Sequence, residues 1–223
     1  MITILDGGMG GEIQKRLAGA AKGLWSATAL VDSPELVVAL HREYIEAGAR
    51  MIITNTYSTV PSYLAKGNLE AEFERYTALG GELARKAVTQ SGESVQVAGS
   101  LPPLSESYRP DLAPEAAIAK PIYARLARAL EPYVDLFLCE TMSSADEAYH
   151  AASQAKAEGN GKPVYVAWTL SETPGTGLRS GESLLTAFER LADLDIDGYL
   201  LNCTTPEAAN AAITELNSSP IDR

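Results

Sequence analysis

Short apolar segments alternate along the chain with longer segments in which apolar residues recur at helical spacing. The apolar segments span 2–5, 51–54, 95–98, 134–138, 164–168 and 198–201. The longer segments span 34–47, 70–89, 114–130, 145–158, 184–191 and 206–216. Short apolar runs are typical of buried strands, and recurrence every three to four residues is typical of amphipathic helices. The pattern therefore predicts six strand–helix units.

Such alternation predicts a parallel sheet, either open and doubly wound or closed into a barrel. The turn after the first apolar segment lacks the third glycine of a dinucleotide fingerprint, because Ile13 follows Gly10 by three residues. Polar residues also end all six predicted strands: Asp6, Asn55, Ser100, Glu140, Thr169 and Asn202 with Cys203. In a (β/α)8 barrel these positions meet at one mouth. We therefore predict an α/β fold, a TIM (β/α)8-type barrel truncated after about six β/α units.

The predicted barrel is incomplete, because six units do not close a ring of eight strands. Residues 217–223 are expected to form a loop leading toward a seventh strand. Residues 1–223 are expected to form a single domain whose C-terminal strands are missing, since 46% hydrophobic content suits one core. Unpaired strand edges favour self-association, so we expect a homo-oligomer.

Charge and cysteine content narrow the class of protein. The net charge is -11, which disfavours nucleic acid and anionic membrane surfaces as partners. Two cysteines cannot form a disulfide framework, and no apolar run is long enough for a signal peptide or a membrane span. These features predict a cytoplasmic protein.

Residues in the first third of the chain are candidates for a ligand site, each with a plainer alternative. Asp6 precedes the glycine-dense segment 7–11, where a ligand or another backbone could approach closely, or where a capped turn could form. Trp25 and Ser26 lie in a long first loop, and Asn55 follows the second strand. A loop Trp either walls a pocket or packs beneath the loop.

Two further candidates follow the third and fourth strands. Ser100 begins a loop fixed by Pro102 and Pro103, which could hold a substrate carboxylate or simply form a rigid turn. Glu140 ends an apolar strand, where an unpaired carboxylate would be costly. It should therefore have a partner, either a substrate ammonium group or an arginine or backbone donor.

Among the thiols and imidazoles, Cys203 is the candidate for chemistry. It precedes a helix that should begin with Pro206, and a helix N-terminus favours a thiolate that could act as nucleophile or metal ligand. The alternative is a small buried hydrophobe. Cys139 should point away from Glu140 and serve packing. His41 and His150 should lie in outer helices, away from the mouth.

Read together, these segments resemble the homocysteine S-methyltransferase family across nearly the whole chain. The matching pieces come in family order: Asp6-Gly7-Gly8-Met9-Gly10, Leu24-Trp25-Ser26, His41 with Tyr44 and Ala47-Gly48-Ala49, Thr54-Asn55-Thr56-Tyr57, Gly99-Ser100-Leu101-Pro102, Glu140-Thr141, Ser180-Gly181-Glu182 and Asn202-Cys203. The resemblance implies a methyltransferase that moves a methyl group from a sulfonium donor, S-methylmethionine or S-adenosylmethionine, to the zinc-bound thiolate of homocysteine, giving methionine. Betaine or a folate as the methyl donor, and a selenol as the methyl acceptor, are open alternatives.

The resemblance also implies residue roles. Asp6 and Glu140 match the carboxylates that hold the substrate ammonium group, while Ser100 and Asn55 match the region of its carboxylate and the donor. Trp25 and Ser26 match a mobile loop over the site. Cys203 matches the first of three cysteine ligands of zinc.

The sequence departs from the family in two respects. Gly11 stands where the family usually has threonine, and the Gly-Gly-Cys-Cys segment that carries the other two zinc ligands is absent. We therefore expect the 223-residue chain alone to be impaired in catalysis. The alternatives are a non-catalytic truncated relative that binds a small amino acid and an unrelated TIM-barrel lyase.

Overall fold

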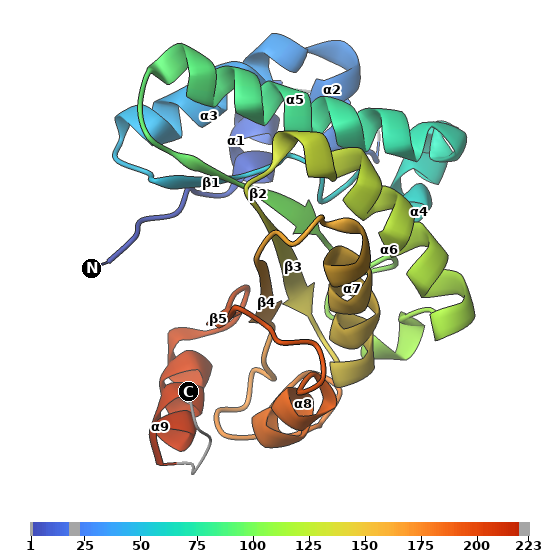
Figure 1. Cartoon of the computed structure of the whole chain (residues 1–223), viewed down its shortest axis with the longest axis vertical. Coiled ribbons are helices and arrows are strands. Elements are labelled where there is room, and N and C mark those ends of the chain that lie inside the picture. Colours follow the sequence, from blue (N-terminus) through green and yellow to red (C-terminus); the bar gives the residue numbers. More distant parts are fainter. Residues whose placement is uncertain (1, 18–22, 219–223) are drawn as a thin grey trace.

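The computed structural model describes residues 2–17 and 23–218, and its centre is one parallel sheet (Figure 1). The sheet order is β1-β2-β3-β4-β5, so neighbouring strands in the chain are neighbours in space. The strands are β1 Met51–Ile53, β2 Gln96–Leu101, β3 Leu136–Met142, β4 Val164–Trp168 and β5 Gly198–Leu201. The predicted parallel α/β fold is confirmed, and within the described residues the barrel is not closed.

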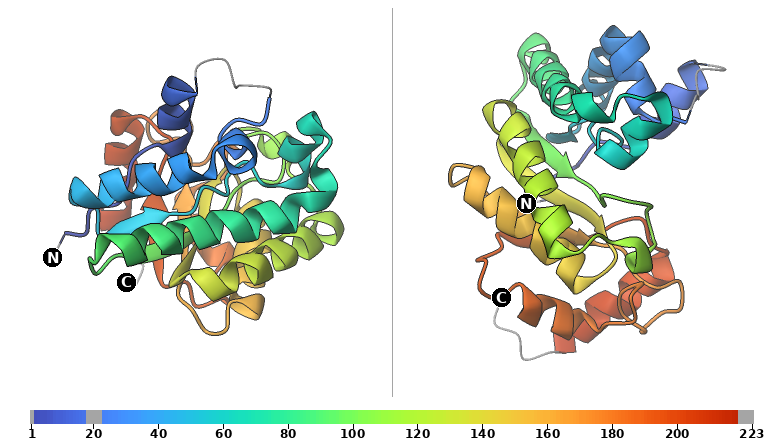
Figure 2. Two further views of the ribbon diagram at one scale, coloured as in Figure 1. Left: turned by 90° about the horizontal axis from the view of Figure 1, so that it is seen from above. Right: turned by 90° about the vertical axis from the view of Figure 1, so that its right-hand side faces the viewer.

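The six predicted helices are all present, with ends within three residues of the predicted ones. They are α3 Pro34–Glu46, α5 Phe73–Ser91, α6 Ala116–Leu130, α7 Ala145–Glu158, α8 Leu184–Arg190 and α9 Pro206–Ser218. The helices α3, α5, α6, α7 and α8 pack beside one another in chain order along the sheet (Figure 2). This layer of helices buries the main apolar core against the sheet.

Shorter helices that the apolar pattern did not predict occupy the connections. They are α1 Met9–Arg16, α2 Ala27–Asp32, α4 Pro61–Leu64, and the 3-10 helices η1 Ala65–Gly67, η2 Glu70–Glu72, η3 Pro110–Leu112 and η4 Glu131–Tyr133. The glycine-dense segment is therefore largely the first turn of α1, with Gly8 as its N-cap. A one- or two-turn helix presents too few residues for a helical period to be recognised.

The predicted first strand is wrong in its extent. Only Leu5 forms a bridge, parallel to Met51, and Arg50 N donates to Ile4 O at 2.8 Å. Ile2 is 92% exposed and Ile4 is 59% exposed, so this apolar segment does not enter the core. Among the described residues the segment pairs only with the start of β1. It has no neighbour on its other side, so it does not extend into a strand.

The strands have two distinct faces. Ala98, Leu136, Leu138 and Ala167 form a small apolar cluster on one face, and the helices cover the other. Because side chains alternate along a strand, Glu140 lies on the same face as Leu136 and Leu138. All five strands are parallel, so their carboxyl ends meet at a single edge.

The end of the chain differs from the prediction. Residues 217 and 218 belong to α9 rather than to a loop, and residues 219–223 lie outside the described residues. No helix in the described ranges is long and apolar enough to cross a bilayer.

Candidate functional site

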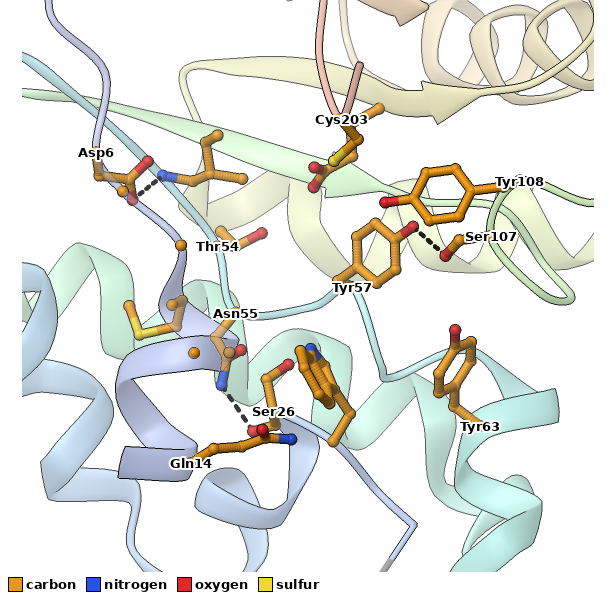
Figure 3. Close-up of a pocket in the computed structure, with 18 of the residues that line it drawn as sticks. Asp6, Gln14, Ser26, Thr54, Asn55, Tyr57, Tyr63, Ser107, Tyr108 and Cys203 are labelled. Carbon is orange, nitrogen blue, oxygen red and sulfur yellow. Dashed lines mark hydrogen bonds between the residues drawn. The ribbon is translucent and has the colours of Figure 1, made fainter. Parts of the chain in front are cut away.

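A cavity of about 650 Å³ opens at the carboxyl ends of the strands. Six of the predicted site residues line it: Asp6, Trp25, Ser26, Asn55, Glu140 and Cys203. Figure 3 draws Asp6 and Tyr108 at opposite sides of this cavity, with Ser26 and Asn55 below. The structure therefore brings together segments that lie almost 200 residues apart in the sequence.

Asp6 occupies a buried position at the inner wall of the cavity. Its side chain is 2% exposed, and Oδ2 accepts a hydrogen bond from Ile53 N at 2.9 Å. Oδ1 has no hydrogen-bond partner among the described residues. Burial, together with the nearby charge of Glu140, raises the pKa of Asp6 to about 7 against the opposing effect of the Ile53 hydrogen bond. The carboxyl group can therefore change its charge near neutral pH.

Trp25 packs against α1 at the entrance. A Cβ built on Gly10 would lie 2.4 Å from the indole Nε1, so only glycine allows this close approach. Trp25 has a positive φ of 48° and remains 45% exposed. Of the two readings for this loop aromatic, the structure favours a pocket wall that solvent can still reach.

Ser26 and Asn55 fix the entry loop to the end of β1. The Asn55 Nδ2 group donates to Ser26 O at 3.1 Å, and the Ser26 and Ser58 hydroxyl oxygens lie 3.3 Å apart. Asn55 is buried, at 3% exposure. Ser26 is the N-cap of α2. The hydrogen bond from Asn55 to Ser26 O therefore holds the start of α2 at the cavity wall.

Glu140 lies where β3 is irregular. The pairing of β3 with β4 shifts between Cys139 and Met142, and Thr141 has a positive φ of 61°. A bulge of this kind re-aims the side chains beside it. The Ser100 hydroxyl donates a hydrogen bond to Glu140 Oε1. Burial raises the pKa of Glu140, and the Ser100 hydrogen bond opposes that shift.

The partner of Glu140 in this structure is thus a hydroxyl, rather than an arginine or a backbone donor. Ser100 itself is 1% exposed and does not line the cavity. Ser100 therefore affects the cavity only by its hydrogen bond to the Glu140 carboxylate.

Cys203 lines the cavity two residues after the end of β5. It is exposed, has a positive φ of 50°, and its Sγ accepts a hydrogen bond from Thr141 Oγ1 at 3.9 Å. The helix α9 begins at Pro206 as predicted, and the Thr205 hydroxyl accepts from Ala208 N at 3.2 Å. The reading of Cys203 as a buried hydrophobe is therefore wrong.

The second cysteine takes no part in the cavity. Cys139 is fully buried on the helix-covered face, and burial raises the pKa of its thiol. Across residues 2–17 and 23–218, no three His, Cys, Asp or Glu side chains form a group that could hold a metal ion.

Several lining residues were not among the predicted site residues, including Tyr57, Tyr63, Lys66 and Tyr108. Tyr57 Oη lies 2.6 Å from Ser107 Oγ, and Lys66 Nζ lies 4.5 Å from the centre of the Tyr63 ring. Lys66 is the one cation among the described lining residues. Loop aromatics give no periodic signal, so their number in the two loops after β1 and β2 was the only available indication.

The prediction that His41 lies away from the mouth is wrong. His41 is fully buried, and its Nδ1 lies 4.0 Å from Asp6 Oδ2. His150 is also buried, at 9% exposure, but does not line the cavity. His41 lies on the buried face of α3, which packs against the first segment of the chain. A helix on the outside of the sheet can therefore still place a side chain beside Asp6.

Comparisons with known proteins agree in both sequence and structure. A sequence model of the family described as Homocysteine S-methyltransferase matches residues 3–222. A homocysteine S-methyltransferase from Escherichia coli (strain K12) is 31% identical over 97% of this chain and 74% of its own length. Homocysteine S-methyltransferase YbgG from Bacillus subtilis (strain 168) is 27% identical over 98% of this chain and 74% of its own. The crystal structure of the metallated form of the Escherichia coli homocysteine methyltransferase MmuM superposes with a TM-score of 0.84 at 29% identity, covering 96% of this chain and 79% of that one.

Proposed function

Because the chain belongs to the homocysteine S-methyltransferase family, we propose that it transfers a methyl group from a small sulfonium donor to the sulfur of homocysteine and so produces methionine. S-methylmethionine and S-adenosylmethionine are the donors in this proposal. The observation that carries it is one cavity lined by two carboxylates, Asp6 and Glu140, and one thiol, Cys203. Homocysteine has an ammonium group at one end and a thiol at the other, so its ends match these groups.

The ammonium group of homocysteine would bind between Asp6 and Glu140. Asp6 Oδ1 is buried and has no hydrogen-bond partner among the described residues, and Glu140 has only the Ser100 hydroxyl. Buried carboxylates require pairing, and an ammonium group supplies both charge and donors. Ser100 would act on the substrate through Glu140 by holding its carboxylate in place.

The aromatic residues of the cavity support a cationic donor. Trp25, Tyr57 and Tyr108 line the same cavity as the two carboxylates. The face of an aromatic ring attracts a sulfonium or ammonium cation. Asn55 and Ser26 would contact the donor side of the substrate pair, and Trp25 would limit the access of water to it.

The reaction is a single displacement. The homocysteine sulfur, once deprotonated, attacks the methyl carbon in line with the breaking bond between that carbon and the donor sulfur. The electron pair of the broken bond returns to the donor sulfur, which becomes a neutral thioether, and the thiol proton leaves to solvent. The residues of this chain contribute by holding the two reactants in line, which removes much of the entropic barrier.

Zinc stays a proposal that rests on the family resemblance. A zinc ion would supply the deprotonated acceptor thiol at neutral pH. The described residues do not make a complete zinc site, since Cys203 is the one cysteine at the cavity and Cys139 faces the helices. We therefore assign Cys203 as one prospective ligand and route no step through the metal.

The single thiol of the cavity favours a second candidate function, the binding of a small amino acid without catalysis. Zinc content separates the two, because a catalytic protein should retain about one ion per chain. A lyase that uses only Asp6 and Glu140 is the third reading. It should tolerate Cys203→Ser, whereas the methyltransferase should lose most of its activity.

The proposed function is tested by incubating the protein with zinc, homocysteine and one methyl-labelled donor at a time. We expect labelled methionine from S-methylmethionine or S-adenosylmethionine and little from betaine or methyltetrahydrofolate. No labelled methionine from any donor, with homocysteine still bound, would favour the amino-acid-binding reading. The reducing cytoplasm is the proposed compartment, because the acceptor must be a free thiol.

A further inference from the structure

We propose that His41 is a positioning residue for Asp6, donating a hydrogen bond from Nδ1–H to the Asp6 carboxylate whenever that carboxylate is ionised, as it must be when a substrate ammonium group binds there. The identity of that ammonium group as homocysteine rests on the proposed function. The pairing of His41 with Asp6 does not, because it concerns two groups of the protein itself.

The geometry leaves both residues with unused hydrogen-bonding capacity beside each other. His41 is fully buried, and neither of its ring nitrogens has a partner among the described residues. Asp6 Oδ1 also lacks one, and Asp6 Oδ2 lies 4.0 Å from His41 Nδ1. Buried polar atoms are nearly always paired, so an unpaired Nδ1 beside a carboxylate indicates a contact that forms in another state. A shift of about 1 Å brings the two atoms within hydrogen-bond distance.

The packing of α3 keeps His41 within reach of Asp6. A Cβ built on Gly7 would lie 2.8 Å from the Tyr44 ring, so the backbone after Asp6 lies directly against this helix. The groups that face Asp6 are the Ile53 amide, the Glu140 carboxyl, Tyr44 and His41. Of these, the Ile53 amide already donates, and Glu140 repels a negative charge. The Tyr44 hydroxyl could also donate, but Tyr44 is only partly buried. His41 is therefore the donor that comes from the buried core.

Neutral histidine is the suitable residue for this role. Burial lowers the pKa of His41 to about 3, so the imidazole is uncharged at neutral pH and carries one N–H. A lysine or arginine at this place would form a permanent ion pair with Asp6 and compete with the substrate ammonium group. A neutral N–H stabilises the ionised carboxylate while leaving its charge available to the ligand.

Two amide substitutions separate this role from simple packing. The amide nitrogen in His41→Asn lies near the position of Nδ1, whereas that in His41→Gln lies near the position of Nε2. We expect His41→Gln and His41→Leu to raise the KM for homocysteine about tenfold, as for the loss of one hydrogen bond to a charged group. His41→Asn should stay within about threefold of the natural protein. The kcat should change less than about twofold because it is measured at saturating homocysteine, and the donor KM should change as little because the donor does not bind at Asp6.

A second readout follows the Asp6 carboxyl directly by carbon NMR in the ligand-free protein. We expect its pKa to rise by about one unit in His41→Gln and His41→Leu, but not in His41→Asn. The matched control is His150→Gln, on α7 and outside the cavity, which should leave both readouts unchanged. Thermal unfolding of each variant reports any loss of packing.

The two readouts make the failures distinguishable. If the natural protein neither binds nor methylates homocysteine, the proposed function fails, and the NMR titration still decides the role of His41. If His41→Asn and His41→Gln shift the pKa of Asp6 equally, or not at all, the proposal is overturned and His41 is a packing residue.

Discussion

The side chain of Asn202 is joined to Thr141 by two hydrogen bonds that pass over the end of β4. Thr141 N donates to Asn202 Oδ1 at 3.1 Å, and Asn202 Nδ2 donates to Thr141 Oγ1 at 3.0 Å. The same Thr141 hydroxyl donates to Cys203 Sγ at 3.9 Å. This pair therefore fixes the bulge at Thr141 and the thiol of Cys203 in one arrangement.

The first prediction concerns Asn202. We expect Asn202→Asp to lower kcat/KM about tenfold, because the carboxylate keeps the acceptor but loses the donor to Thr141 Oγ1. The free energy of unfolding should fall by about 1 kcal/mol, the usual net value of one hydrogen bond. Steady-state kinetics and urea unfolding measure the two effects. An unchanged kcat/KM would show that the pair does not position Cys203.

The second prediction concerns the hydrogen bond between Ser100 and Glu140. Ser100→Ala removes a donor that lowers the pKa of Glu140, so burial should raise that pKa further. A carboxyl group with a raised pKa in the folded state binds its proton more tightly there, so the free energy of unfolding falls as pH rises. We expect Ser100→Ala to cost about 1–2 kcal/mol at pH 8 and clearly less at pH 4.5.

The matched control for Ser100 is Ser143→Ala. The Ser143 hydroxyl is buried and has no hydrogen-bond partner among the described residues. Its removal should change the free energy of unfolding by less than about 0.5 kcal/mol at either pH. Equal pH dependence in the two variants would contradict the role given to Ser100.

The third prediction is a pH dependence caused by Asp6. Its pKa is raised from 3.8 to about 7, so the free ligand site is largely protonated below pH 7. A protonated carboxyl group cannot pair with ammonium, so kcat/KM for homocysteine should fall about tenfold per pH unit below 7 and level off above it. Asp6→Asn should remove this limb and lower kcat/KM at pH 8. A kcat/KM for homocysteine that does not change between pH 5.5 and 7.5 would contradict this role of Asp6.

The same shift affects stability. Between about pH 4 and 7 the folded protein holds a proton on Asp6 that the unfolded chain has released. The contribution of Asp6 to the free energy of unfolding therefore decreases as pH rises through this window. Glu147 is buried outside the cavity, and its pKa is also raised to about 7. Its contribution to the free energy of unfolding has the same pH dependence, and that dependence should remain in Asp6→Asn.

The fourth prediction uses two neighbouring glycines. A Cβ at Gly10 would meet Trp25 Nε1 at 2.4 Å, whereas a Cβ at Gly11 meets nothing within 4 Å. Gly10→Ala should displace the indole, shift its fluorescence and raise the donor KM several-fold. Gly11→Ala should leave both unchanged and stabilise α1 by about 0.5–1 kcal/mol. Trp168 is fully buried, so an added quencher distinguishes the signal of Trp25. Equal effects of the two substitutions would contradict a role for Trp25 at the entrance.

The sequence predicted the helices and the direction of Glu140 because these depend on periodic burial. Five of the six strand positions follow from short apolar runs that pair with one another in the sheet. The run at 2–5 is as apolar as the others, but Ile2 and Ile4 are exposed. Whether an apolar run is covered depends on its tertiary neighbours, which local pattern does not contain.

The site was predictable where strand ends bring it together, and less so elsewhere. Asp6, Asn55, Glu140 and Cys203 were found because parallel strands place their ends at one edge. The contact of His41 with Asp6 depends on which face α3 turns toward the core. The bulge at Thr141 depends on a strained φ that no residue type required. The direction of the Ser100 hydroxyl, toward Glu140, likewise depends on the pairing of β2 with β3.

The most direct test of the proposed function compares homocysteine with its desamino analogue, 4-mercaptobutanoate, as methyl acceptors from labelled S-methylmethionine in the presence of zinc. The two acceptors share the thiol and the carboxylate and differ in the ammonium group. The natural protein should methylate homocysteine with a kcat/KM at least about 100-fold higher, and the double variant Asp6→Asn, Glu140→Gln should lose that preference. Equal use of the two acceptors by the natural protein would contradict the assignment of Asp6 and Glu140 to the ammonium group, and no methylation of either acceptor would contradict the proposed reaction.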